Sequence, residues 1–98
     1  GAQSPGLELV ADSRREIHET GTCGAWFDWT VGPKLVEKIA QDRPLVCPHF
    51  QPGDAIFFDH YCLHRTAEGP NDTLPRYALE SWFFAESRAP AKQQPILF

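Results

Sequence analysis

The chain of 98 residues has no methionine, few cysteines and no long apolar run. Its three cysteines, Cys23, Cys47 and Cys62, are odd in number and form no CxxC pair, so we expect no disulfide framework, a reducing compartment and buried or half-buried thiols. No run approaches the roughly 18 apolar residues that a membrane-spanning helix requires, and the first residues lack a basic region followed by an apolar core. We therefore expect a cytoplasmic protein with no membrane partner.

Clustered positive charge is also missing. The chain has 13 acidic and 9 basic residues, a net charge of -4, and basic side chains that are scattered along it. Because binding to a phosphate backbone requires gathered lysines and arginines, we expect no nucleic-acid partner. The length predicts one domain over residues 1–98, and a domain of this size buries only about 60 to 65 per cent of the surface of its unfolded chain. Its core is therefore expected to be thin.

The first half of the sequence predicts one strand and one short helix. Residues 7–10 are mainly apolar and follow the turn signal Ser4-Pro5-Gly6, which predicts a strand, and residues 11–24 are expected to form a loop. Pro33 opens a segment in which Leu35, Val36 and Ile39 share a helical face. Four aromatic residues are expected to pack in the core: Trp26, Phe27, Trp29 and Trp82.

The second half is expected to be rich in strands. Gln51-Pro52-Gly53-Asp54 has the proline and glycine of a type II turn, which would join two antiparallel strands. A polar turn and a long aromatic and aliphatic strand would follow. The expected strands are residues 45–50, 55–58 and 77–84, with the polar turn at residues 68–72; residues 96–98 are expected to pack back onto the body.

Two side chains carry the candidate chemistry. His64 lies twelve positions before Arg76, with a strand-like run on either side. A neutral imidazole at the end of a strand is a common ligand for iron, zinc, nickel or copper. Period-two alternation places Arg76 with Ala78 and Glu80 on one face, and a covered guanidinium needs an anion, for which a carboxylate is the geometric match. The pair therefore predicts a metal ligand and a carboxylate clamp in one cavity.

Both residues could also have purely structural roles. His64 could be a histidine hydrogen-bonded at the edge of a loop, and Arg76 could form an internal salt bridge to Glu80 or Asp59. A metal site made of Asp59, His60 and His64 is a further alternative, although it would place all its ligands in one short bend.

The segments PGDAIFFDHYCLHRT and NDTLPRYALESWFFA resemble the C-terminal half of the phytanoyl-CoA dioxygenase family of Fe(II)- and 2-oxoglutarate-dependent oxygenases. The start of the chain is similar as well, with Gly6, Leu7, Ser13 and Arg14 in register. The resemblance implies a mainly β fold, a partial double-stranded β-helix or cupin-like jelly roll with one short helix. It also implies Fe(II) and 2-oxoglutarate as cofactors, a small-molecule substrate, His64 as a metal ligand and Arg76 as the residue that binds the distal carboxylate of 2-oxoglutarate.

One departure from the family pattern concerns the His-x-Asp motif, which supplies the other two iron ligands. None of the histidines is followed two positions later by Asp or Glu. We therefore expect the C-terminal portion of such an oxygenase, inactive by itself. A half jelly roll would leave unpaired strand edges, so we also expect a homodimer that completes the sheets. The alternative is a non-catalytic jelly-roll or cupin-like domain that binds a small carboxylate or assembles with other proteins.

Overall fold

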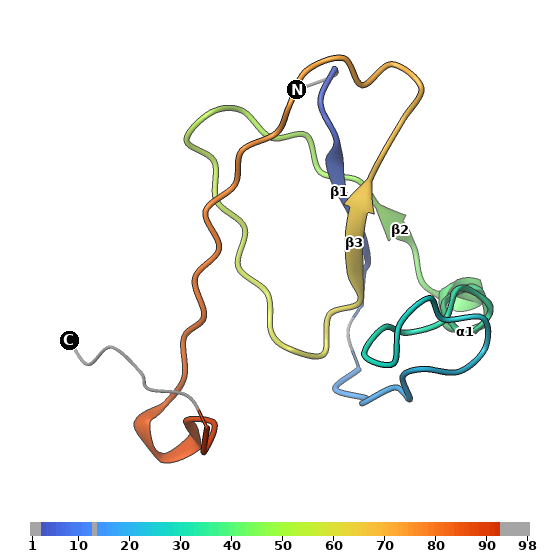
Figure 1. Ribbon diagram of the computed structural model, residues 1–98, viewed down its shortest axis with the longest axis vertical. Helices are drawn as coiled ribbons and strands as arrows, with labels where there is room; N and C mark the ends of the chain where they lie inside the picture. Colours follow the sequence, from blue (N-terminus) through green and yellow to red (C-terminus); the bar gives the residue numbers. More distant parts are fainter. Residues whose placement is uncertain (1–2, 13, 93–98) are drawn as a thin grey trace.

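The computed structural model describes residues 3–12 and 14–92. Short elements are separated by long irregular segments, as Figure 1 shows. In chain order they are β1 (Gly6–Val10), α1 (Pro33–Ile39), the 3-10 helix η1 (Ala40–Asp42), β2 (Leu45–Val46), β3 (His64–Ala67) and the 3-10 helix η2 (Glu86–Arg88). The described part of the chain is thus a small antiparallel sheet with one short helix, and the mainly β character expected from the sequence is confirmed at this level.

The sheet has three strands in the order β2-β1-β3, and both pairings are antiparallel. β1 is central, and its register with β3 pairs Leu9 with His64 and Leu7 with Thr66. Residues that lie opposite each other in an antiparallel pair project from the same face, so these four side chains share one face of the sheet. The other face carries Glu8 opposite Arg65, and these two form an ion pair of 2.7 Å.

The helix starts where the sequence predicts it. Pro33 occupies the first helical position, where its missing N–H costs no hydrogen bond, and Gly32 precedes it with an extended backbone. The carbonyl of Gly32 accepts hydrogen bonds from the backbone N–H groups of Leu35 and Val36, both at 3.0 Å. The predicted apolar face, which also includes Ile39, is the partly covered side of the helix.

Local turns also follow the prediction. Gly53 has a φ of 96°, and the N–H of Asp54 donates to the carbonyl of Gln51 over 3.0 Å, as a type II turn requires. The predicted polar turn closes in the same way, because the N–H of Asp72 donates to Gly69 over 3.1 Å.

Several strand predictions are wrong. Only Leu45–Val46 of the segment 45–50 lies in the sheet, and residues 55–58 and 77–84 form no strand. A strand exists only when its backbone pairs with another strand, and the described residues supply no partner to these two segments. The predicted hairpin across the turn at Gly53 is therefore absent from the described part of the chain.

Few side chains are buried. Val10 is the one buried apolar residue in the described ranges, at 5 % exposure. The aromatic residues expected in the core are exposed instead: Trp26 at 87 %, Phe27 at 53 %, Trp29 at 74 % and Trp82 at 74 %. Cys23 and Cys47 are exposed and only Cys62 is partly covered, so the expectation of buried thiols is wrong for the first two.

The overall dimensions agree with a thin core. The accessible surface is 8699 Å², whereas a compact monomer of this mass has about 5,700 Å². The radius of gyration is 15.4 Å, compared with about 13 Å for a compact domain of this length. In Figure 1 the segments around residue 55 and around residue 80 extend away from the sheet, which increases both the accessible surface and the radius of gyration.

Two predictions concern residues outside the described ranges. They are the packing of residues 96–98 and the role of Ser13 in the family pattern. Among the residues that are described, no helix has both the length and the apolar character needed to cross a membrane.

Candidate functional site

His64 is the first residue of β3, and its imidazole lies on the exposed face of the sheet. The ring packs against Phe58, with ring centroids 4.6 Å apart and planes inclined by 50°. Nδ1 lies 3.0 Å from the backbone carbonyl of Cys62. A carbonyl can only accept, so in a neutral imidazole this contact is a hydrogen bond donated by Nδ1, and the lone pair is then on Nε2. Many metal-binding histidines are oriented by such a backbone carbonyl.

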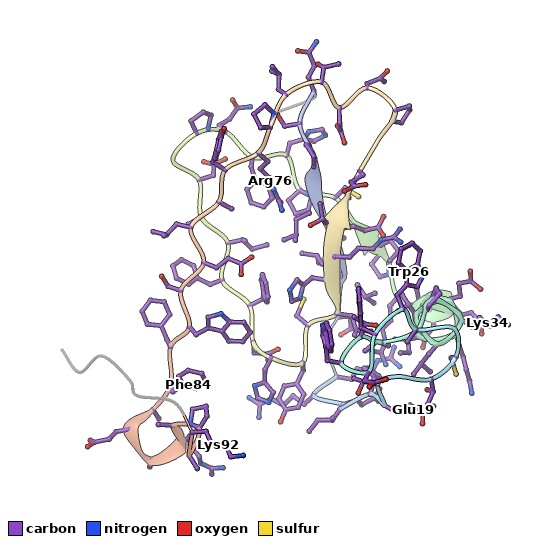
Figure 2. All side chains as sticks on the ribbon, viewed as in Figure 1. Glu19, Trp26, Lys34, Arg76, Phe84 and Lys92 are labelled. Carbon is purple, nitrogen blue, oxygen red and sulfur yellow. The ribbon has the colours of Figure 1, made fainter. Side chains whose placement is uncertain are left out.

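Arg76 reaches back to the sheet from the segment that follows the polar turn. Its Nη1 donates to the backbone carbonyl of Gly6 over 3.0 Å, and its Nη2 lies 3.5 Å from Oγ1 of Thr66, at the outer limit of a hydrogen bond. In Figure 2 the side chain points from that segment toward β1. The guanidinium is exposed, so the expected position on a covered face is wrong.

Thr66 places the two candidate residues relative to each other. His64 and Thr66 are two positions apart in β3, so their side chains project from the same face with a spacing of about 7 Å along the strand. The guanidinium of Arg76 is in contact with the Thr66 hydroxyl. The imidazole and the guanidinium therefore lie on one side of the sheet.

An open groove of about 540 Å³ lies beside Arg76. Its walls come from the chain around β1, from the segment leading to the turn at Gly53, and from the residues around Arg76. His49 and Tyr77 contribute polar groups to its lining. His64 is not among the lining residues, so the groove contains the carboxylate-clamp candidate and not the metal-ligand candidate.

The described residues contain no group of three or more His, Cys, Asp or Glu side chains placed to hold a metal ion. The alternative site from Asp59, His60 and His64 is among the arrangements that the structure does not form. Asp59 Oδ1 accepts a hydrogen bond from the N–H of Tyr61 at 3.0 Å, and the His60 ring packs on the Tyr61 ring at 4.0 Å. Each of these side chains is engaged by Tyr61 rather than by His64.

The two proposed salt-bridge partners of Arg76 are not used. Among the described residues the ion pairs involve Arg14, Arg43 and Arg65, and neither Glu80 nor Asp59 pairs with Arg76. The guanidinium of Arg76 thus contacts a carbonyl and a hydroxyl, both neutral, and its charge has no carboxylate partner in the described ranges.

The sequence did not predict the contact between Thr66 and Arg76, and it did not predict the ion pairs of Arg14, Arg43 and Arg65. Thr66 could have been found from its period-two spacing to His64, had residues 64–67 been assigned as a strand. Arg43 is the most covered charged side chain of these pairs, at 8 % exposure, and its Nη2 donates to Glu16 Oε2 over 3.1 Å. Its Nε is buried without a hydrogen-bond partner among the described atoms. Nothing in the sequence near residue 43 signals this, because the partner is 27 positions away.

Three groups have shifted pKa values, and one of them is Arg14, whose pKa is raised chiefly by its hydrogen bond to Asp42. Partial burial raises the pKa of the Cys62 thiol, and the negative charge of Asp59 adds to the increase. The hydrogen bond from Arg14 holds the pKa of Asp42 below its ordinary value, and the bond length of 3.0 Å fits this effect.

Comparison with known proteins adds no relative: no protein-family model, no curated protein and no solved structure matches this chain.

Proposed function

We propose that this chain is the C-terminal portion of an Fe(II)- and 2-oxoglutarate-dependent dioxygenase of the phytanoyl-CoA dioxygenase type, built on part of a jelly roll. In this proposal Arg76 binds the distal carboxylate of 2-oxoglutarate and His64 supplies one ligand to the iron. The observation that supports it best is the common position of the two side chains on one side of the sheet, joined through Thr66.

The roles of the chain's own residues follow from their contacts. The carbonyl of Gly6 fixes Nη1 of Arg76, which leaves other N–H groups of the planar guanidinium to form paired hydrogen bonds with a carboxylate. Thr66 limits the position of Nη2 and can donate its own hydroxyl proton to the same carboxylate. In the neutral imidazole, the hydrogen bond to the carbonyl of Cys62 places the proton of His64 on Nδ1 and leaves Nε2 as the nitrogen that can bind a metal.

The described residues supply only part of an iron site. His64 is suited to be a ligand, but the described residues do not form a complete set around it. When bound in a complete site, iron and 2-oxoglutarate supply the oxidising chemistry, while the protein orients the substrate and excludes water. We derive no catalytic step for this chain itself and expect it to show no turnover alone.

Calorimetric titration with 2-oxoglutarate tests this function. We expect Arg76→Ala to weaken binding by about 10- to 100-fold, since a hydrogen-bonded charge contributes about 1.5 to 3 kcal/mol. Arg76→Lys should recover only part of the loss, because an ammonium group cannot form the two parallel bonds. Arg88→Ala, which removes an exposed arginine in η2, is the matched control and should bind as the parent chain does.

A repeat of the titration with Fe(II) under anaerobic conditions tests the metal ligand. The dioxygenase proposal expects Fe(II) to tighten binding of 2-oxoglutarate in the parent chain and expects His64→Ala to remove that gain. No binding of 2-oxoglutarate with or without Fe(II) would contradict the proposal.

A non-catalytic domain that binds a small carboxylate is the second candidate. It is favoured by the charge of Arg76, which is available to an anion without any metal. This candidate expects succinate and 2-oxoglutarate to bind similarly, with no effect of Fe(II) and no effect of His64→Ala. The same titrations therefore separate the two functions.

A further inference from the structure

Residues 77–84 have the properties of a strand without a partner. The segment contains neither glycine nor proline, is rich in aromatic and aliphatic residues, and runs as an extended trace that lies apart from the sheet in Figure 1. Its large side chains are exposed: Tyr77 at 91 %, Leu79 at 96 %, Trp82 at 74 % and Phe83 at 75 %. Both faces of the segment therefore present apolar surface to water.

The backbone of the same segment is unpaired. Before it, the N–H groups of Thr73 and Leu74 both donate to the carbonyl of Gln3 at 2.9 Å, and after it Arg88 donates to Ala85 at 2.8 Å. Between these points no backbone hydrogen bond joins residues 77–84 to the rest of the described chain. A partner that covered the apolar side chains without pairing the backbone would bury these N–H and C=O groups at a high cost. The partner must therefore supply a strand.

The exposed surface of this segment is available to a partner. The chain as a whole exposes about 3,000 Å² more than a compact monomer of its mass, and the large side chains of residues 77–84 contribute to that excess; a standard protein interface covers about 800 Å² on each partner. A second copy of this chain offers an unpaired strand of the same length and the same apolar character. Two copies related by a two-fold axis form a closed dimer, in which one edge of each strand is paired with the other copy.

Charge selects the register of such a pair. In a two-fold antiparallel pair the axis passes a residue that lies opposite its own copy. An axis at Glu80 would place two carboxylates opposite each other, which is unfavourable. An axis at Ser81 uses the whole segment: Leu79 lies opposite Phe83, Glu80 opposite Trp82 and Ala78 opposite Phe84, with no like charges opposed.

We propose that this chain forms a homodimer in which residues 77–85 of two copies pair as antiparallel strands about a two-fold axis at Ser81. The pairing brings the exposed side chains of the two copies into cross-strand contact and satisfies the backbone groups along one edge of each strand. The test of this interface is separate from the test of the proposed function, because the interface involves neither His64 nor Arg76.

Sedimentation equilibrium tests the dimer, with Ser81→Glu as the main variant and Ser87→Glu as its control. Ser81→Glu places two carboxylates at the axis, and we expect the dissociation constant to rise on the order of tenfold. Ser87 is exposed and outside the paired segment, so Ser87→Glu should dimerise as the parent chain does. A monomeric parent chain, an open higher oligomer, or a dimer unaffected by Ser81→Glu would overturn the proposal.

Hydrogen exchange tests the strand pairing itself. In the dimer the alternate amides of residues 77–85 should exchange more slowly than the same amides in the diluted monomer. A dimer in which all these amides exchange at the rate of an unstructured peptide would show that the copies associate through other surfaces and would overturn the pairing.

Discussion

At the scale of single residues, backbone carbonyls position the functional candidates. The carbonyl of Cys62 orients the His64 imidazole, and the carbonyl of Gly6 fixes the Arg76 guanidinium. Neither contact depends on the identity of the side chain at the carbonyl-bearing residue. The two candidates are thus held by the path of the backbone around β1 and β3, so changes to the sheet register would disturb them more than nearby side-chain substitutions.

The Cys62 thiol gives a pH-dependent prediction at this scale. Its pKa is raised in the folded chain, chiefly by burial and further by Asp59. A raised folded pKa favours the neutral thiol, so this contribution to stability is present below the unfolded pKa of about 8.5 and is lost as the pH rises through the higher folded value. We expect the midpoint for alkylation of Cys62 by iodoacetamide to lie above that of the denatured chain.

Asp59→Asn should move that midpoint down, because it removes the nearby negative charge while its side-chain oxygen can still accept from Tyr61. Glu86→Gln removes an equal charge in η2 and should leave the midpoint unchanged. Mass spectrometry of the alkylated peptide measures Cys62 separately from the other thiols. A midpoint for Cys62 equal to that of the denatured chain would contradict the role of burial.

At the scale of elements, the start of α1 depends on a glycine that packs against the preceding loop. Gly32 is buried, and a Cβ at this position would collide with the carbonyl oxygen of Thr22 and lie 2.5 Å from that of Cys23. Both neighbours are backbone atoms, so they can move away only if the loop shifts. The loop and the helix are therefore adjusted to each other at this one position.

Gly32→Ala should destabilise the chain by about 1 to 3 kcal/mol, the usual cost of overpacking. Gly69→Ala is the control, because its nearest neighbours would be the Asp72 carboxylate oxygens at 3.9 Å, an ordinary contact. Urea unfolding at equal protein concentration measures the difference. Equal midpoints for the two variants would mean that the loop yields without cost.

The elements that could be predicted from the sequence are those fixed by local interactions. Pro33 sets the helix start and Pro52-Gly53 sets the turn, because each depends on the backbone of a few neighbours. Residues 55–58 and 77–84 have strand composition, but composition does not supply a partner strand. A common cavity for His64 and Arg76 was predicted, but the groove beside Arg76 does not include His64, and the link through Thr66 required the register of β3 with β1.

At the scale of the whole molecule, the three tryptophans can show which exposed surfaces a dimer covers. Trp26, Trp29 and Trp82 are all exposed, and Figure 2 places Trp26 far from Phe84 at the end of the unpaired segment. A dimer through residues 77–85 would cover Trp82 and leave the other two in water. Their fluorescence should therefore respond differently to protein concentration.

We expect a chain that keeps only Trp82, with Trp26→Phe and Trp29→Phe, to show a blue shift of its emission as concentration increases. The matched variant Trp82→Phe, which keeps Trp26 and Trp29, should show a constant emission maximum over the same range. A shift of equal size in both variants would indicate general aggregation and would contradict an interface limited to the unpaired segment.

The pairing of β1 with β3 also determines when the sheet can form. The ion pair between Glu8 and Arg65 joins positions 57 residues apart, so most of the chain must be synthesised before β1 meets its longest partner. Such distant contacts slow folding, because the entropy of closing a long loop is lost before the contacts form. During translation, Leu7 and Leu9 are synthesised before their partners Thr66 and His64 and stay unpaired until those residues follow. In this interval the nascent chain is a candidate for chaperone binding.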